Sequence, residues 1–210
     1  MNPRAESAPP LWRQLQLVAQ AVQGVREGRS LAAQLEQVEP ALRPGVQALS
    51  FHALRWLGTA EVLRRALARR APPPAVDALL CTALALAQPE PDALYEPFTL
   101  VNQTVEAARR QPALRVQSAF INACLRRFLR ERAALMATAL QDPVARWNHP
   151  RWWVERLKRD HPGHWQAILA AAQQPAPMDL RVNLQRTSVE AFSADLARHG
   201  LQADVLGGAA

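Results

Sequence analysis

The sequence contains almost no lysine, few cysteines and no long apolar run. Lys158 is the only lysine, so the formal net charge of +7 comes almost wholly from arginine. Cys81 and Cys124 lie far apart, and neither occurs in a C-x-x-C motif, which argues against a disulfide framework or a cysteine-based zinc site. The most apolar run, 75–87, contains Asp77 and is too short to span a bilayer. We therefore expect a soluble, cytoplasmic protein without a metal.

Glycine is also scarce relative to proline. The 210 residues include seventeen prolines and eight glycines, a composition that favours short helices punctuated by proline over a sheet-rich fold. A chain of this length buries roughly 70% of its unfolded surface on folding. The sequence therefore predicts a mainly α protein with one or two cores that need no covalent support.

Two amphipathic helices are predicted in the middle of the chain, at 99–110 and 116–132. In each of them, apolar residues recur at helical spacing on one side and polar residues on the other. The polar residues Asn102, Glu106 and Asn122 fall on the facing helices. We expect these three to form a structural hydrogen-bond network that joins the helices, with Arg126 or Arg127 paired to Glu106.

The same region carries a local formal charge of +5. Glu106 and Glu131 are its only acids, and its arginines are Arg109, Arg110, Arg115, Arg126, Arg127, Arg130 and Arg132. A basic excess of this kind favours polyanionic partners such as RNA. The alternative is a helix face whose charges are only solvated.

The amino-acid patterns of the two helices resemble those of a known family. Residues 101–108 have the pattern Val-Asn-x-Thr-Val-Glu-Ala-Ala, and residues 120–130 have the pattern Phe-Ile-Asn-Ala-x-Leu-Arg-Arg-Phe-Leu-Arg. This pair resembles the NusB-like domain that begins the Sun/Fmu family of 16S ribosomal RNA cytosine-5 methyltransferases. Gln103 stands where the family usually has an acidic residue, and Cys124 where it usually has an aliphatic one. The resemblance implies a NusB-like all-α helical bundle over 1–141.

The last third of the chain is expected to hold two further parts. Residues 142–174 form a helical connector, and its His149-Pro150-x-Trp152 segment extends the resemblance beyond the NusB-like domain. Residues 175–210 read as a strand at 178–182, a helix at 188–199 that begins with a Thr187/Glu190 capping box, and a strand at 201–206. Such a β-α-β segment is an incomplete α/β unit. The resemblance implies the start of a small α/β domain, and we expect the chain to be truncated before the methyltransferase domain.

The family transfers a methyl group from S-adenosylmethionine to a cytosine of small-subunit ribosomal RNA, using one cysteine as nucleophile and a second for product release. No catalytic or cofactor-binding residue can be assigned here. No glycine-rich cofactor loop is present, and neither Cys81 nor Cys124 follows a proline. We expect this chain to be inactive alone, without a cofactor, and to bind small-subunit ribosomal RNA; its oligomeric state stays open.

Candidate RNA contacts are the basic and polar residues on the predicted outer faces: Arg109, Arg110, Arg126, Arg127, Arg130, Arg156, Arg181 and Asn183. On the helix after Pro150, Trp152 lies in one stripe with Arg156, so the two could stack on bases and pair with phosphates. The alternative is that Trp152 and Trp153 seal a joint between domains. Two other functions stay open, a NusB-type transcription antitermination factor and a helical protein-interaction module.

Overall fold

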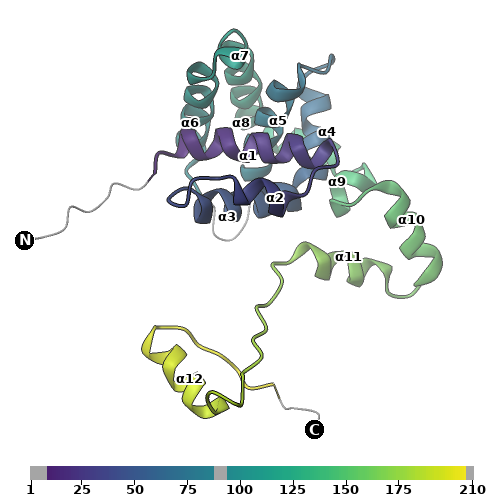
Figure 1. Cartoon of the computed structure of the whole chain (residues 1–210). Coiled ribbons are helices and arrows are strands. Elements are labelled where there is room, and N and C mark those ends of the chain that lie inside the picture. Colours follow the sequence, from purple (N-terminus) through teal and green to yellow (C-terminus); the bar gives the residue numbers. More distant parts are fainter. Residues whose placement is uncertain (1–8, 88–93, 207–210) are drawn as a thin grey trace, which may run out of the picture. The chain divides into compact units, whose positions relative to one another are not determined.

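The structure is a computed structural model that describes residues 9–87 and 94–206. It divides the chain into two compact units, 1–173 and 174–210, and it confirms the prediction of a mainly α protein (Figure 1). The second unit holds α12 (Val189–Arg198). The helices of the first unit are α1 (Leu11–Arg26), α2 (Leu31–Glu36), α3 (Arg43–Arg55), α4 (Leu57–Leu67), α5 (Pro74–Leu86), α6 (Pro97–Arg110), α7 (Pro112–Arg115), α8 (Ser118–Ala139), α9 (Pro143–Trp147), α10 (Arg151–Asp160) and α11 (Trp165–Gln173).

Helix α5 forms the centre of the bundle. Its residues are apolar nearly all round, and every side chain from Ala78 to Leu86 is buried. Helices α1, α3, α4, α6 and α8 all pack against it. Full burial of one leucine or valine contributes roughly 1.5–3 kcal/mol, so this helix supplies a large share of the hydrophobic stabilisation.

Helices α6 and α8 form the predicted amphipathic pair. They pack side by side and are joined by the short α7 (Figure 1). Ile121, Cys124, Leu125 and Phe128 are buried, which confirms the predicted apolar face of α8. The helix continues to Ala139 past non-helical backbone angles at Glu131.

Helix α9 is tied to the bundle by a close approach to the start of α4. A Cβ on Gly58 would lie 2.5 Å from the Val144 carbonyl oxygen and 2.9 Å from the Asn148 Cα atom. The Thr59 backbone N–H donates to Asn148 Oδ1 (2.8 Å), and the Thr59 hydroxyl donates to the Ala145 carbonyl oxygen (2.7 Å). Asn148 thus satisfies an N–H in the first turn of α4, which has no cap of its own.

The predicted β-α-β segment is not formed in the described part of the chain. Helix α12 is present, but residues 178–182 and 201–206 belong to no strand. The helix is capped by Ser188, whose hydroxyl accepts from the Ala191 N–H (3.2 Å), and not by the predicted Thr187. No residue of α12 is buried, and Leu180, Leu201 and Val205 are exposed. Two short segments form a sheet only when their backbones pair and one face is covered, and here neither condition is met.

Among the described residues, no helix has the length and hydrophobicity needed to cross a membrane.

Candidate nucleic-acid interface

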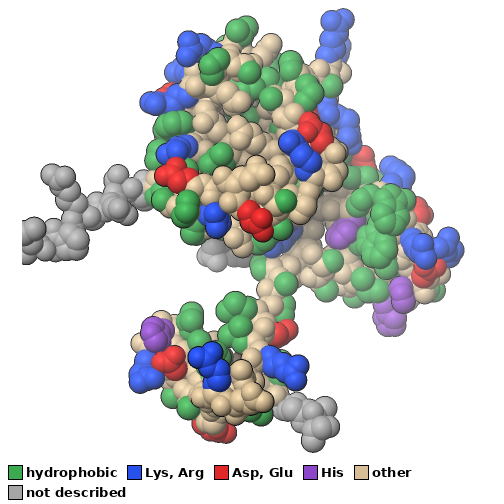
Figure 2. Space-filling view, viewed as in Figure 1, with side chains coloured by type: hydrophobic (Ala, Val, Ile, Leu, Met, Phe, Trp, Pro, Cys, Tyr) green, Lys and Arg blue, Asp and Glu red, His purple; other side chains and the backbone are tan. Residues whose placement is uncertain are grey.

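Three arginines, one on each of α6, α7 and α8, are exposed to solvent. Among the described residues, Arg109, Arg115 and Arg126 form no ion pair with a carboxylate. Arg115 Nε donates to the Arg109 carbonyl oxygen (3.0 Å), which links α7 to the end of α6. Figure 2 shows Lys and Arg side chains in blue over the part of the bundle that α6 and α7 form. We call these three exposed arginines, Arg109, Arg115 and Arg126, the cationic surface, and they are the strongest candidates for contact with phosphates.

The other predicted arginines of these helices are partly neutralised. Arg110 pairs with Glu106 on its own helix, and its guanidinium lies 4.4 Å from the ring centroid of Trp12. Arg127 Nε lies 2.9 Å from Glu131 Oε2, and Arg130 Nη2 lies 3.9 Å from Glu131 Oε1. Exposed pairs at i, i+4 spacing stabilise a helix by only about 0.3–0.5 kcal/mol. Arg127 and Arg130 can therefore exchange their carboxylate for a phosphate at little cost.

The predicted network of Asn102, Glu106 and Asn122 is not formed among the described residues. Glu106 pairs with Arg110 instead of Arg126 or Arg127, and the Asn102 side chain is exposed to solvent. The physical reason is proximity, since side chains four residues apart on one helix meet without ordering a second element.

Two other polar side chains tie α6 and α8 to their neighbours. Gln103 Oε1 accepts from the Trp12 N–H (3.1 Å) in the first turn of α1, where Pro10 supplies no side-chain cap. Arg132 Nη2 donates to the carbonyl oxygen of Ala87, the residue at the C-terminal cap of α5. A cation is favoured at a helix C-terminus. Gln103 and Arg132 therefore act in the packing of the bundle, which the sequence alone did not indicate.

The connector helices have a small core of their own. Val154, Leu157 and Leu169 are buried, with Trp147 and Trp165 packed against them. Trp152, for which base stacking and the sealing of a joint between domains were the two alternatives, is 66% exposed, so the packing of α10 does not depend on it. The predicted partner in its stripe, Arg156, pairs with Asp160 (3.3 Å).

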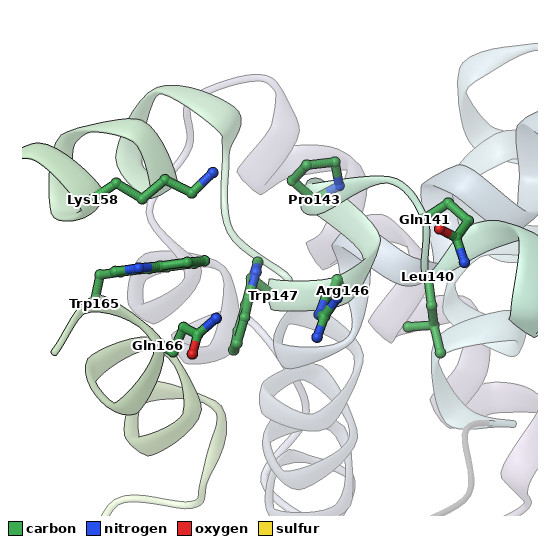
Figure 3. A pocket seen from close by; sticks show the side chains of 8 residues that line it. All are labelled: Leu140, Gln141, Pro143, Arg146, Trp147, Lys158, Trp165 and Gln166. Carbon is green, nitrogen blue, oxygen red and sulfur yellow. The ribbon is translucent and has the colours of Figure 1, made fainter. Parts of the chain in front are cut away.

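Trp147 and Trp165 also line a pocket of about 190 Å³ (Figure 3). Their rings meet edge to face with centroids 5.3 Å apart. The Arg146 guanidinium lies 5.5 Å from the Trp147 ring centroid, and Lys158 Nζ lies 5.0 Å from that of Trp165. The sequence analysis considered Trp152 and Trp153 of one helix, because helical spacing groups residues of one helix and does not show which residues of α9, α10 and α11 converge.

Two of the predicted RNA contacts, Arg181 and Asn183, lie in the second unit. Arg181 is exposed. Asn183 Oδ1 accepts from the Gln185 N–H (3.0 Å), and the Asn183 carbonyl oxygen accepts from the N–H groups of Arg186 and Thr187. Such a local pattern fixes a turn, so Asn183 has a structural role in the turn before α12.

Both cysteines are buried. Burial raises the pKa of the Cys81 thiol to about 11, and it also raises the pKa of the Cys124 thiol. A protonated thiol is a poor nucleophile, so neither cysteine is suited to catalysis at neutral pH. Within 9–87 and 94–206, no group of three or more His, Cys, Asp or Glu side chains is placed to hold a metal ion.

Comparison with known proteins supports the family resemblance. The family model described as "Methyltr_RsmF/B-like, ferredoxin-like domain" matches residues 149–209. The chain is 34% identical to ribosomal RNA small subunit methyltransferase B of Pseudomonas putida, over 97% of the chain and 45% of that protein. It is 31% identical to the protein of the same name from Pseudomonas syringae pv. tomato, over 97% of the chain and 44% of that protein. A probable ribosomal RNA small subunit methyltransferase B of Coxiella burnetii is 36% identical over 51% of the chain and 25% of that protein.

The chain thus spans less than half the length of each of these relatives. The resemblance predicted from the helix pair is confirmed, and it extends over nearly the whole chain, including the part that follows the helical bundle. Nearly the whole chain is thus similar to part of ribosomal RNA small subunit methyltransferase B, the Sun/Fmu family whose helix pattern it resembles.

Proposed function

We propose that this chain binds small-subunit ribosomal RNA and positions it for an S-adenosylmethionine-dependent cytosine-5 methyltransferase. The names of the relatives support the substrate class. The observation that carries the proposal is the cationic surface of Arg109, Arg115 and Arg126, whose guanidiniums face solvent without a carboxylate partner among the described residues.

The proposed contact is electrostatic and only weakly selective for sequence. Guanidiniums pair with phosphate oxygens through two parallel N–H groups, and phosphate contacts fix the position of a protein on RNA without reading bases. Arg127 and Arg130 are additional phosphate contacts in this proposal, because exposed ion pairs such as theirs with Glu131 are weak and easily exchanged. Arg156 and Arg181 are further contacts outside the bundle.

The proposal also covers the architecture in finer detail. The bundle of 1–141 is taken as NusB-like, 142–174 as a connector, and 175–210 as the start of an α/β domain. The family model over 149–209, described as ferredoxin-like, supports the last assignment. The methyl transfer itself belongs to the proposed whole enzyme, since no catalytic residue is assigned in this chain.

The proposal is tested by the salt dependence of binding to a small-subunit ribosomal RNA hairpin, measured by filter binding. Each phosphate contact contributes roughly 0.7–0.9 to the negative slope of log K against log salt concentration. We expect the double variant R109Q/R126Q to lower that slope by about 1–2 and to bind several-fold more weakly at low salt.

The matched control is R29Q. Arg29 is also exposed, and R29Q removes one positive charge where R109Q/R126Q removes two. Arg29 is paired with Glu27 at 2.8 Å and lies at the end of α1, outside the cationic surface. We expect it to bind like the parent chain. Equal slopes for R109Q/R126Q, R29Q and the parent chain would exclude this surface as the RNA contact.

A further inference from the structure

The pocket between α9, α10 and α11 combines aromatic rings with two cations. Trp147 comes from α9 and Trp165 from α11, and Lys158 from α10 reaches over the Trp165 ring (Figure 3). Pro143 and Gln141 close the opposite side. Among the residues that the structure describes, no acidic side chain lines the pocket.

The two cations differ in how far they are neutralised. Lys158 Nζ lies 3.1 Å from Glu155 Oε1, an exposed pair at i, i+3 spacing. Arg146 is exposed, has no carboxylate partner among the described residues, and is held only by its position over Trp147. Cation–π contact leaves the charge of a guanidinium intact, so the pocket is positively charged at its mouth.

We propose that this pocket binds one unpaired nucleotide of a single-stranded RNA segment. The base stacks against the indole and guanidinium planes of Trp147 and Arg146, and the adjoining phosphate pairs with Arg146 and Lys158. The inference rests on the proposed RNA-binding function, and it adds a second contact, distinct from the cationic surface, that grips an unstacked base.

Size and chemistry support this occupant. The volume of about 190 Å³ is below the ~300–1,000 Å³ that encloses a drug-sized ligand, so the pocket takes one ring system. Proteins hold single-stranded RNA by stacking bases on aromatic rings and on arginine, in grooves lined with positive charge. An acidic peptide would use the cations but would leave the two indoles without a planar partner.

A simple packing role for these side chains is the competing explanation. The stems of Arg146 and Lys158 could serve only to cover Trp147 and Trp165, as long basic side chains often do. The two explanations differ in what they expect from a ligand that has phosphates but no bases.

The experiment uses the full chain and a 5′-fluorescein-labelled octamer of uridines, titrated at low salt and followed by fluorescence anisotropy. Removing one stacked base contact changes affinity by about 1–3 kcal/mol, which is roughly fivefold to 150-fold in Kd. We expect R146Q to weaken binding on the order of tenfold, K158Q to weaken it by less, and W147F to retain most of it, because a phenyl ring still stacks.

The matched control is R151Q, which loses the same charge at an exposed position near Asp142 that does not line the pocket. An octamer with abasic sites tests the base directly. We expect the parent chain to bind it more weakly than the uridine octamer, and the effect of R146Q to shrink. The proposal is overturned if R146Q behaves like R151Q, if the abasic octamer binds as tightly, or if poly-glutamate displaces the octamer at equal charge concentration.

Failure of this proposal and failure of the proposed function are distinguishable. The hairpin assay with R109Q/R126Q reports on the cationic surface, while the octamer assay with R146Q reports on the pocket. Suppose that R109Q/R126Q weakens hairpin binding while R146Q leaves octamer binding unchanged. That result would refute the pocket proposal and leave the proposed function intact.

Discussion

Asp77 is the acid at the centre of a partly buried charge cluster that joins α1, α4 and α5. Arg26 Nη1 donates to its Oδ2 (2.8 Å), and Arg64 Nε lies 2.7 Å from its Oδ1. The side chains of Asp77 and Arg64 are each 15% exposed and that of Arg26 is 22% exposed. Arg26 also pairs with Glu61 at 2.9 Å. Substitution D77N keeps the volume and removes the charge that both guanidiniums share.

We expect D77N to lower the free energy of unfolding by about 2–3 kcal/mol. Removal of one partner from a buried ion pair costs about 3–5 kcal/mol, because the other charge is left unpaired. Partial exposure reduces that figure, and Glu61 still compensates Arg26. Loss of an acid from the first turn of α5 adds about 0.3–1 kcal/mol through the helix dipole.

Urea denaturation followed by far-UV circular dichroism measures the effect. With a slope of about 2 kcal/mol per molar urea, the midpoint should fall by about 1–1.5 M. The control E27Q breaks the exposed Arg29–Glu27 pair, which contributes about 0–1 kcal/mol. A double-mutant cycle of D77N with R64Q should give a coupling energy of roughly 1–2 kcal/mol. If D77N lowers the free energy of unfolding by no more than E27Q does, the proposed stabilising role of this charge cluster is refuted.

Three further predictions concern packing and ionisation. Q103A should destabilise the chain by about 0.5–2 kcal/mol because the Trp12 N–H loses its acceptor, whereas Q103E should be neutral or stabilising. Thermal unfolding measures the difference, and equal Tm values for the two variants would contradict the role of Gln103 as a cap of α1. G58A should cost about 1–3 kcal/mol because backbone atoms of α9 block the new Cβ, while G163A, with open space around it, should be neutral in the same urea assay. The Cys81 thiol ionises above pH ~8.5 in the unfolded chain but keeps its proton to about pH 11 in the folded chain. The free energy of unfolding should therefore be constant below pH ~8.5 with respect to this group, and should fall by about 2–3 kcal/mol as the pH rises to about 11. The variant C81A should not show this fall, and C124A should still show it. If the free energy of unfolding depends on pH equally in the parent chain and in C81A, the burial argument is contradicted.

The sequence predicted the helices of the bundle well because their apolar spacing is strong and their ends carry clear signals. The run at 75–87 is apolar on all sides, and α5 is accordingly buried on all sides. The exposed arginines of α6 and α8 were also predicted, since they lie opposite a wide apolar face.

What the sequence did not show depends on contacts between elements. Helical spacing placed Glu106 near α8, but local pairing with Arg110 prevails. Arg132 was counted only in the local charge of the helix pair, yet it binds the end of α5. The pocket at Trp147 and Trp165 depends on how three short helices converge, which periodicity within one helix does not encode. The predicted strands at 178–182 and 201–206 failed because extended segments need pairing partners that local sequence does not guarantee.

The central claim is that the guanidiniums of Arg109, Arg115 and Arg126 contact ribosomal RNA. Its most direct test is an NMR titration of the arginine Nε–Hε signals with a small-subunit ribosomal RNA hairpin, each signal assigned by substitution. The account predicts large shifts for Arg109, Arg115 and Arg126, and little change for Arg132, whose guanidinium is held by the Ala87 carbonyl oxygen. Saturating RNA that leaves the signals of Arg109, Arg115 and Arg126 unmoved would contradict it.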